Sequence, residues 1–475
     1  MGVWPDIGPA PAIIIMQNMS TALAPTARLA HNTVRAKTVR AKTVKVEPPA
    51  TRNRAVDAYR AMAMCAVALG HWLAADVRLG TDGHLRGGNA LDRVSGLHIL
   101  TWAFQVMPLF FCIGGFSNAA SLDAHARRGG TPAVWIRARL RRLSTPAAWL
   151  AGTWFTVATV GPIVGISQSL IRAAIGTAAI PLWFLGNYVA DTALAPFTLL
   201  LYRRHGNRFL AVLTVLFVSL EATRFPKLHY LAQCNIVIGW LFFQMIGFAW
   251  KDGRLPAGRA LIRVGIGAWV IAGALVAFGP WPLAMVSVPG AQFANTWPPS
   301  IALLAYGIGS CSFFIAAAPS VSRFLERSTR SWKVVIVANT MTMTSYLWHF
   351  TALAISAVVC QRLGILPTAA VGSTAWWVQK VPLLGIALVV LAVLVALLSP
   401  KERRGLFTGA EPTTAVGNVG TAVAAVSLAA GFELWTAASG DARFALPGIG
   451  LILAVHAFLT GSHTKFRVFH PSRSR

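Results

Sequence analysis

The sequence predicts an all-α, polytopic transmembrane helical bundle of about 10–12 helices with both termini in the cytoplasm. Three observations predict it. The 475 residues are 55% hydrophobic and only 12% charged, with a mean hydropathy of +0.59, values typical of a membrane protein rather than a soluble domain. Twelve stretches are long and apolar enough to cross a bilayer. Basic residues gather in alternate loops between those stretches, as the positive-inside rule requires.

The candidate spans are apolar stretches of about 18 residues or more. The fifth is short, and the last two are rich in Ala and Gly. In chain order they cover residues 55–75, 99–121, 145–164, 180–202, 207–223, 231–250, 263–280, 300–318, 334–359, 379–399, 415–436 and 444–461. An even number of spans places both ends of the chain on the same side of the membrane.

The net charge of +27 follows the predicted topology and does not indicate nucleic-acid binding. With the basic N-terminal arm in the cytoplasm, every even-numbered loop should be cytoplasmic, and each carries a cluster of Lys or Arg. The seventh loop, around Trp281 to Pro299, has no charge at all. A wrong number of spans would scramble this alternation. We therefore expect the lipid bilayer, and no nucleic acid, as a partner.

The chain divides into three regions. Residues 1–53 are expected to form a disordered basic cytoplasmic arm, in which a five-residue repeat spans positions 33–42. The arm enforces orientation, and a contact with anionic lipid head groups is the alternative. Residues 54–400 hold ten spans, and residues 401–475 hold two more with a basic cytoplasmic tail. No signal peptide is evident, and the five cysteines lack the spacing of metal ligands, so no metal is expected.

The first span carries ionisable residues on one face. Arg60 and His71 are eleven residues apart, close to three helical turns, which places them on one face and roughly 16 Å apart along the axis. Asp57 lies three residues before Arg60, where the two side chains can pair. Ionisable residues inside a membrane are costly and indicate function. Asp57, Arg60 and His71 are therefore the candidate catalytic residues.

A second basic feature follows the second span. Arg139 and Arg142 are three residues apart, so on a helical turn they share a face. Guanidinium groups match the geometry of phosphate oxygens, and this pair can hold a phosphorylated donor that arrives from the cytoplasm. A simple role in setting the topology is the alternative.

Polar and aromatic residues mark three further spans. Trp183 begins the fourth, where a role at the membrane interface is as good an interpretation as substrate binding. Tyr346 and His349 lie in the ninth, and a membrane histidine is more often a hydrogen-bonded packing residue than a substrate ligand. Glu221 and Arg224 stand at the outer end of the fifth span, where we expect them to pair. Trp183, Tyr346 and His349 complete the candidate substrate-binding set.

The series Arg54-x-x-Asp57-x-x-Arg60, followed by ten residues and His71, resembles the opening motif of the acyltransferase family 3 membrane proteins. The resemblance runs from about residue 54 to residue 400. Gly114 stands where the family commonly has Ser, which affects local packing or one hydrogen bond. Four further segments correspond: Met107–Phe116, Arg139-x-x-Arg142, Leu182–Leu185 and Ser345–His349.

The resemblance implies an integral membrane O-acyltransferase of the inner or plasma membrane. Such an enzyme moves an acyl group, commonly acetyl, from cytoplasmic acyl-CoA to a hydroxyl of a carbohydrate or lipid-linked sugar at or beyond the outer face. Arginines at the inner end suit a CoA phosphate. His71 suits either proton abstraction or transient acyl carriage, and Asp57 would orient Arg60. Acyl-CoA is then a substrate, and no permanently bound cofactor is expected.

Two other classes compete with the enzyme. A secondary transporter also fits twelve spans with both ends inside, and Asp57, Arg60 and His71 would then form a proton relay. However, the two halves of the chain show no evident repetition, and the ionisable stripe lies in one span alone. A membrane scaffold leaves that stripe unexplained. The acceptor, the acyl chain length and the oligomeric state stay open.

Overall fold

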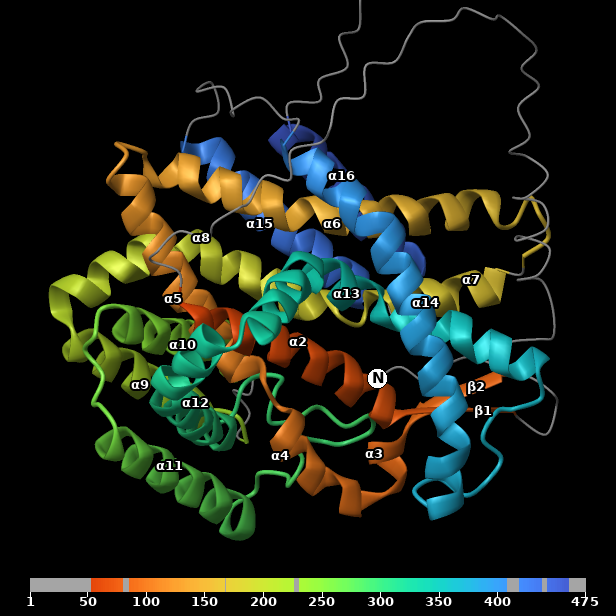
Figure 1. Cartoon of the computed structure of the whole chain (residues 1–475), viewed down its shortest axis with the longest axis horizontal. Coiled ribbons are helices and arrows are strands. Elements are labelled where there is room, and N and C mark those ends of the chain that lie inside the picture. The colour runs from red at the N-terminus through yellow and green to blue at the C-terminus, as the bar shows by residue number, and fades with distance from the viewer. Residues whose placement is uncertain are drawn as a thin grey trace, which may run out of the picture.

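The computed structural model describes residues 53–79, 85–166, 168–225, 230–407, 418–437 and 442–460. The basic arm before Asn53 and the basic tail after residue 460 lie outside these ranges. Within them the protein is a bundle of helices with one small antiparallel hairpin, β1 paired with β2 (Figure 1). The predicted all-α membrane bundle is therefore confirmed.

The helices and strands follow one another along the chain with short connections. In order they are α2 (Arg54–Ala74), β1 (Ala75–Leu79), β2 (Leu85–Asn89), α3 (Ala90–Arg93), η1 (Ser95–Leu100), α4 (Thr101–Phe104), α5 (Met107–Ala126), α6 (Pro132–Val160), α7 (Gln168–Ala179), α8 (Leu182–His205), α9 (Asn207–Glu221), η2 (Leu231–Cys234), α10 (Asn235–Lys251), α11 (Arg259–Phe278), α12 (Ile301–Arg327), α13 (Thr329–Arg362), α14 (Thr374–Phe407), α15 (Asn418–Ala437) and α16 (Ala442–Thr460).

Each of the twelve predicted spans overlaps a helix of the structure. Eight helical segments in the described part of the chain are both long and apolar enough to cross a membrane. The helices α2, α6, α9 and α16 do not meet both conditions. α9 has only 15 residues, and charged residues at the start of α2 and in the first half of α6 reduce their mean hydropathy. The chain is a multi-pass membrane protein.

The third helix begins earlier than the predicted span. Residues 145–164 were expected to cross the membrane, with the preceding arginines in a loop, but α6 starts at Pro132. Proline suits the first turn of a helix, because its missing N–H would have no partner there. Arg139 and Arg142 therefore lie on helical turns rather than in a loop. Their long side chains can reach the aqueous boundary while the backbone stays helical.

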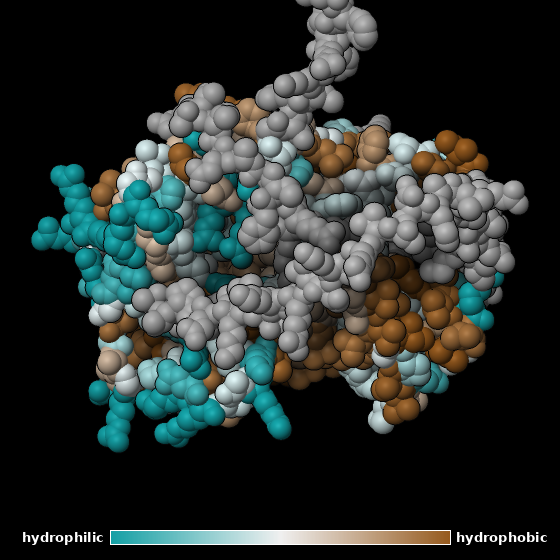
Figure 2. Space-filling view, turned by 45° about the horizontal axis from the view of Figure 1, so that its top comes forward, coloured by the Kyte–Doolittle hydropathy of each residue, from teal (hydrophilic) through white to brown (hydrophobic). Residues whose placement is uncertain are grey.

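Basic connections gather at one end of the molecule. The turns that join α5 to α6, α8 to α9 and α10 to α11 lie toward the left of Figure 1, and hydrophilic side chains gather at the left of Figure 2. Arg203 pairs there with Asp123 at 2.7 Å and with Asp252 at 2.8 Å, which ties three helices together. This is the end that the predicted topology assigns to the cytoplasm. A large hydrophobic surface occupies the lower right of Figure 2.

Glycine allows α5 and α10 to pack closely. A Cβ on Gly115 would lie 2.0 Å from the carbonyl oxygen of Gln244, and one on Gly247 would lie 2.0 Å from that of Cys112. Since no side-chain carbon fits at either point, the two backbones approach more closely than other residues permit. A Cβ at Gly114 would lie 2.8 Å from the ring of Tyr188, so close packing accounts for this glycine as well.

The two helices beyond residue 400 pack against the rest of the bundle. α15 lies against α8, and α16 lies against α6 (Figure 1). His456 of α16 and Ser144 of α6 are in hydrogen-bond contact at 3.1 Å. The carboxylate of Glu433 lies beside Gly186, where a Cβ would approach it to 2.7 Å. Both added helices therefore place ionisable side chains against the core.

Candidate functional site

Helix α2 is fixed in the middle of the bundle. The side chain of Asn53 accepts a hydrogen bond from the Val56 amide and caps the helix at 3.2 Å. Tyr59 donates its hydroxyl to the carbonyl of Phe314 at 2.8 Å, and Asn339 of α13 donates to the carbonyl of Asp57 at 2.8 Å. The face that carries the predicted catalytic residues is thereby held against α12 and α13.

The predicted pairing of Asp57 with Arg60 is present. The two side chains are 3.2 Å apart, and Arg60 also donates to the hydroxyl of Ser117 on α5 at 2.6 Å. Asp57 is buried, whereas the Arg60 side chain is 28% exposed. Asp57 therefore fixes one edge of the guanidinium group and leaves part of it accessible.

Arg60 and Arg139 meet on the same residue, although 79 positions separate them in the chain. Arg139 donates to the Ser117 carbonyl at 3.4 Å and to the hydroxyl of Ser121 at 2.5 Å. The charges of Arg60 and Arg142 act on Arg139, which places all three within electrostatic reach. We call Arg60, Arg139 and Arg142 the inner arginine cluster. Such a concentration of guanidinium groups suits a phosphorylated ligand.

The structure also brings together two histidines that the sequence separates by 278 positions. Nδ1 of His71 lies 2.9 Å from Nε2 of His349, and the two rings are parallel to within 8°. His349 is fully buried, and its Nδ1 contacts the Tyr346 carbonyl at 2.5 Å. Trp72 donates its indole N–H to the His349 carbonyl at 3.0 Å. α2 and α13 are therefore locked together at the histidine pair.

These contacts assign the protons of the two rings. A carbonyl only accepts hydrogen bonds, so the Tyr346 carbonyl requires the proton of neutral His349 on Nδ1. Nε2 of His349 is then an acceptor, and the donor must be Nδ1 of His71. Nε2 of His71 therefore carries a free lone pair. One ring nitrogen is left available as a base or nucleophile.

Two polar atoms close to His349 in the sequence have no hydrogen-bond partner within the described ranges. They are the indole nitrogen of Trp348 and the hydroxyl of Thr351, and both residues are buried. Buried polar groups are normally paired, so unpaired ones beside a reactive side chain indicate a place for a polar ligand. This observation separates the histidine pair from an ordinary packing contact.

The two remaining predicted substrate-binding residues lie next to the histidines. Tyr346 is buried and donates its hydroxyl to the Pro181 carbonyl at 2.6 Å, so the main chain occupies this hydroxyl. Trp183 is half-buried, and its ring contacts those of Trp240 and Trp297, each at 6.1 Å. Substrate contacts by Tyr346 and Trp183 stay predictions.

Lys380 is a residue of the site that sequence reasoning missed. It belongs to α14, is 1% exposed, and donates to the carbonyls of Leu73 and Ala75, the former at 2.7 Å. Its ammonium group lies 4.1 Å from the centre of the Trp376 ring. A cation at a helix C-terminus opposes the helix dipole favourably. The available signal was a lone lysine at the start of an otherwise apolar span.

The hairpin directly after α2 is held by an ion-pair group. Asp76 of β1 lies 3.4 Å from Arg78 and 3.2 Å from Arg93. Burial raises the pKa of Asp76 above its ordinary value, and the two arginines oppose that rise. The C-terminal end of α2 is therefore fixed from two sides, by Lys380 and by this hairpin.

Comparison with known proteins gives one match. A family model described as an acyltransferase domain matches residues 53–399, well over half of the chain. It begins at the residue that caps α2 and covers the inner arginine cluster, both histidines and Lys380. Helices α15 and α16 lie beyond it. No curated protein and no solved structure matches the chain.

Proposed function

Because the chain belongs to acyltransferase family 3, we propose that it is a cell-membrane O-acyltransferase. It transfers an acyl group, acetyl in the first instance, from cytoplasmic acyl-CoA to a hydroxyl of a cell-envelope glycan or glycolipid. The observation that carries this proposal is the contact between His71 and His349, which leaves one basic nitrogen on His71. Family membership favours this enzyme over the transporter that the sequence also allows.

The inner arginine cluster is the proposed site for the phosphates of the donor. It gathers three guanidinium groups near the cytoplasmic end of α2, and only Asp57 is in ion-pair contact with Arg60. The histidine lies about three helical turns further along the same face, roughly 16 Å away. The extended pantetheine arm of CoA suits this separation, because it carries the thioester far from the phosphates.

His71 is the proposed general base. Its free Nε2 takes the proton from the acceptor hydroxyl as the oxygen attacks the thioester carbonyl. The C–S bond breaks, an ester forms, and the proton passes to the departing thiolate to give free CoA. His349 accepts a hydrogen bond from Nδ1 of His71 throughout, which favours the positive charge that develops on His71. The chemistry needs no further co-reactant.

The same nitrogen also supports an acyl-carrier mechanism. In that case Nε2 of His71 attacks the thioester first, CoA leaves, and an acyl-imidazole then acylates the hydroxyl. The two mechanisms are distinguished by incubating the protein with labelled acetyl-CoA without an acceptor and quenching rapidly. Label bound to His71 indicates the carrier, whereas its absence in an enzyme that transfers label indicates the general base.

Transfer of label tests the proposal. Purified protein in lipid is given radiolabelled acetyl-CoA and a cell-envelope extract, and CoA release and labelled product are measured. We expect wild type to transfer label, His71→Ala to lose transfer, and His205→Ala, an exposed histidine at the end of α8, to retain it. Folded wild-type protein that releases no CoA with any envelope fraction would overturn the proposal.

A further inference from the structure

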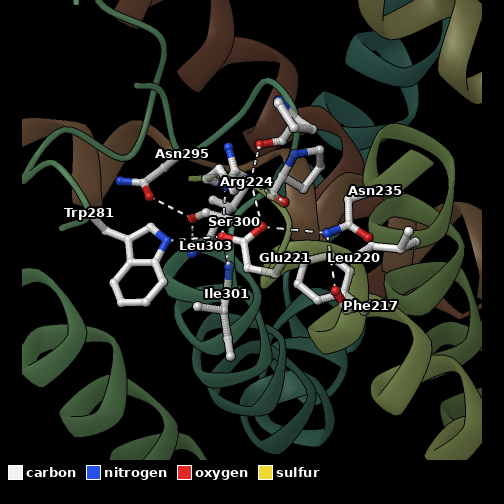
Figure 3. A network of polar contacts seen from close by, with 12 residues as sticks. Phe217, Leu220, Glu221, Arg224, Asn235, Trp281, Asn295, Ser300, Ile301 and Leu303 are labelled. Atoms are coloured by element: carbon white, nitrogen blue, oxygen red, sulfur yellow. Dashed lines mark hydrogen bonds and ion pairs between the residues drawn. The ribbon is translucent and has the colours of Figure 1, made fainter. Parts of the chain in front are cut away.

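The loop between α11 and α12 is fixed far more strongly than its sequence suggests. Residues 279–300 contain no charged side chain, and we call them the outer loop because the predicted topology places them outside the membrane. Figure 3 shows the polar network that holds one end of it. Glu221 at the end of α9 accepts hydrogen bonds from the Trp281 indole at 3.0 Å and from the Ile301 amide at 3.3 Å.

The predicted pairing of Glu221 with Arg224 is present and organises this network. Arg224 binds the Glu221 carboxylate with two N–H groups, at 2.9 and 2.7 Å, and both side chains are buried. The same guanidinium donates to the carbonyls of Pro298 and Pro299 at 3.0 and 3.1 Å. A buried ion pair is costly unless its remaining groups are satisfied, and here the loop satisfies them.

The middle of the outer loop is fixed as well. Asn295 donates to two carbonyls within the loop and accepts from Ser300 at 2.6 Å (Figure 3). Met285 accepts from Gln105 through its carbonyl, and its amide donates to Thr101 at 2.8 Å. The loop is therefore preorganised by contacts to α4, α9 and the segment after α4. Preorganisation reduces the ordering cost of binding.

The segment that this network holds carries Trp297. The residue directly precedes the two prolines bound by Arg224, and Trp297 is 40% exposed. Its ring contacts that of Trp183 edge to face, at 6.1 Å and 84°. Further ring contacts join Trp183 to Phe184 at 6.3 Å and Phe184 to Tyr346 at 5.5 Å. An aromatic row therefore leads inward from the outer loop.

The row ends at the candidate catalytic residues. The Tyr346 ring lies 5.9 Å from that of His349, which in turn contacts His71 at 5.1 Å. Beside the row, the buried Trp240 contacts Trp183, and its indole N–H has no hydrogen-bond partner in the part of the chain that the structure describes. An unpaired donor at this place points to a ligand that brings an acceptor oxygen.

We propose that Trp297 and Trp183 form the binding platform for the acceptor, and that the acceptor presents an uncharged sugar ring. This inference rests on the proposed function. Aromatic side chains offer a flat apolar face to the C–H groups of a sugar, while its hydroxyls stay free to hydrogen bond. The outer loop offers no charge to attract an ionic acceptor. The free donor of Trp240 lies beside Trp183, where a hydroxyl oxygen of the bound sugar could accept it.

Substitutions in the outer loop test the platform. Phe293 is the matched control, because it lies on the same loop, is also 40% exposed, and contacts Phe225 rather than Trp183. Dodecyl maltoside serves as the sugar acceptor and dodecanol as the sugar-free alcohol, both in lipid with labelled acetyl-CoA. For Trp297→Ala we expect KM for dodecyl maltoside to rise about 10-fold. For Trp297→Phe and Phe293→Ala we expect KM within about twofold of wild type.

The outcomes separate this inference from the proposed function. KM for acetyl-CoA and the rate with dodecanol should be unchanged in Trp297→Ala, which also shows that the variant folds. An unchanged KM for the glycoside in Trp297→Ala, an equal loss with dodecanol, or an equal loss in Phe293→Ala each overturn the platform. A wild type that labels dodecanol and not the glycoside does so too. Wild type that consumes no acetyl-CoA refutes the proposed function itself.

Discussion

At the scale of single residues, the position of one proton on His349 decides the chemistry. The Tyr346 carbonyl holds that proton on Nδ1, so the other nitrogen of His349 accepts from His71. His71 is thereby left with its free nitrogen away from the pair. A buried neighbour that orients a base in this way is the general logic of activated side chains in hydrolases and transferases. His349 is thus a positioning residue for His71 in the proposed reaction.

Replacing His349 should reduce turnover without weakening donor binding. In His349→Ala the ring of His71 loses the acceptor that fixes its orientation and its protonated nitrogen. We expect kcat to fall roughly 100-fold, while KM for acetyl-CoA, which depends on the inner arginine cluster, stays within about twofold. Steady-state kinetics of label transfer measures both constants. A His349→Ala variant with wild-type kcat would show that the contact is packing alone.

Lys380 should matter for both stability and turnover. Lys380→Met leaves the carbonyls of Leu73 and Ala75 without their donor, and each such loss costs about 1–3 kcal/mol when the group is buried. We expect a lower unfolding temperature and a reduced kcat, because the end of α2 that carries His71 is released. Lys333→Met, at an exposed position of α13, is the control and should match wild type in both measurements.

At the scale of elements, apolar length and charge alternation predict most of the helices. Each predicted span falls on a helix, because an uninterrupted apolar stretch in lipid must satisfy its backbone internally. The start of α6 was missed, since the arginines from Arg137 to Arg142 resemble a loop in composition while their backbone is helical. The hairpin after α2 was not predicted, because its strands are only five residues long and depend on Asp76.

The functional site divides in the same way. The pairing of Asp57 with Arg60 was predictable, because both residues lie on one helix with a fixed spacing. The contact of His71 with His349 was not, since it depends on how α2 packs against α13. Lys380 was hidden for the same reason. Its partners are main-chain carbonyls of another helix, which carry no sequence signal.

The packing of α5 against α10 can be tested with one methyl group. In Gly115→Ala the new Cβ meets the Gln244 carbonyl, and in Gly247→Ala it meets that of Cys112. Overpacking of this kind typically costs about 1–3 kcal/mol, so we expect both variants to unfold at a lower temperature in detergent. Gly267→Ala on α11, where a Cβ meets nothing within 4 Å, should behave as wild type. Equal unfolding temperatures for all three would contradict the close packing.

At the scale of the whole molecule, the two substrates approach the histidine pair from opposite ends of the bundle. The inner arginine cluster lies toward the end with the basic turns, and the aromatic row leads in from the uncharged outer loop. The histidines lie between them, fixed by α2 and α13. In this account the protein holds a route across the membrane for an acyl group, with separate residues for donor and acceptor.

This division predicts separable kinetic effects. Arg139→Lys keeps the positive charge but loses the two-pronged geometry that suits phosphate, so KM for acetyl-CoA should rise about 10-fold with kcat nearly unchanged. KM for the acceptor should not move. The opposite pattern is expected for Trp297→Ala. Parallel titrations of donor and acceptor with both variants make the comparison. An Arg139→Lys variant that weakens only acceptor binding would contradict the proposed arrangement.

The central claim is that His71 and His349 act as one unit in acyl transfer. The most direct test measures single-turnover transfer of labelled acetyl from acetyl-CoA to an envelope extract by wild type, His71→Ala, His349→Ala and the double variant. Residues that act as a unit show strongly non-additive losses. We predict that the double variant is no slower than His71→Ala alone. Wild-type transfer that survives in His71→Ala, or a double-variant loss equal to the product of the two single losses, would contradict the account.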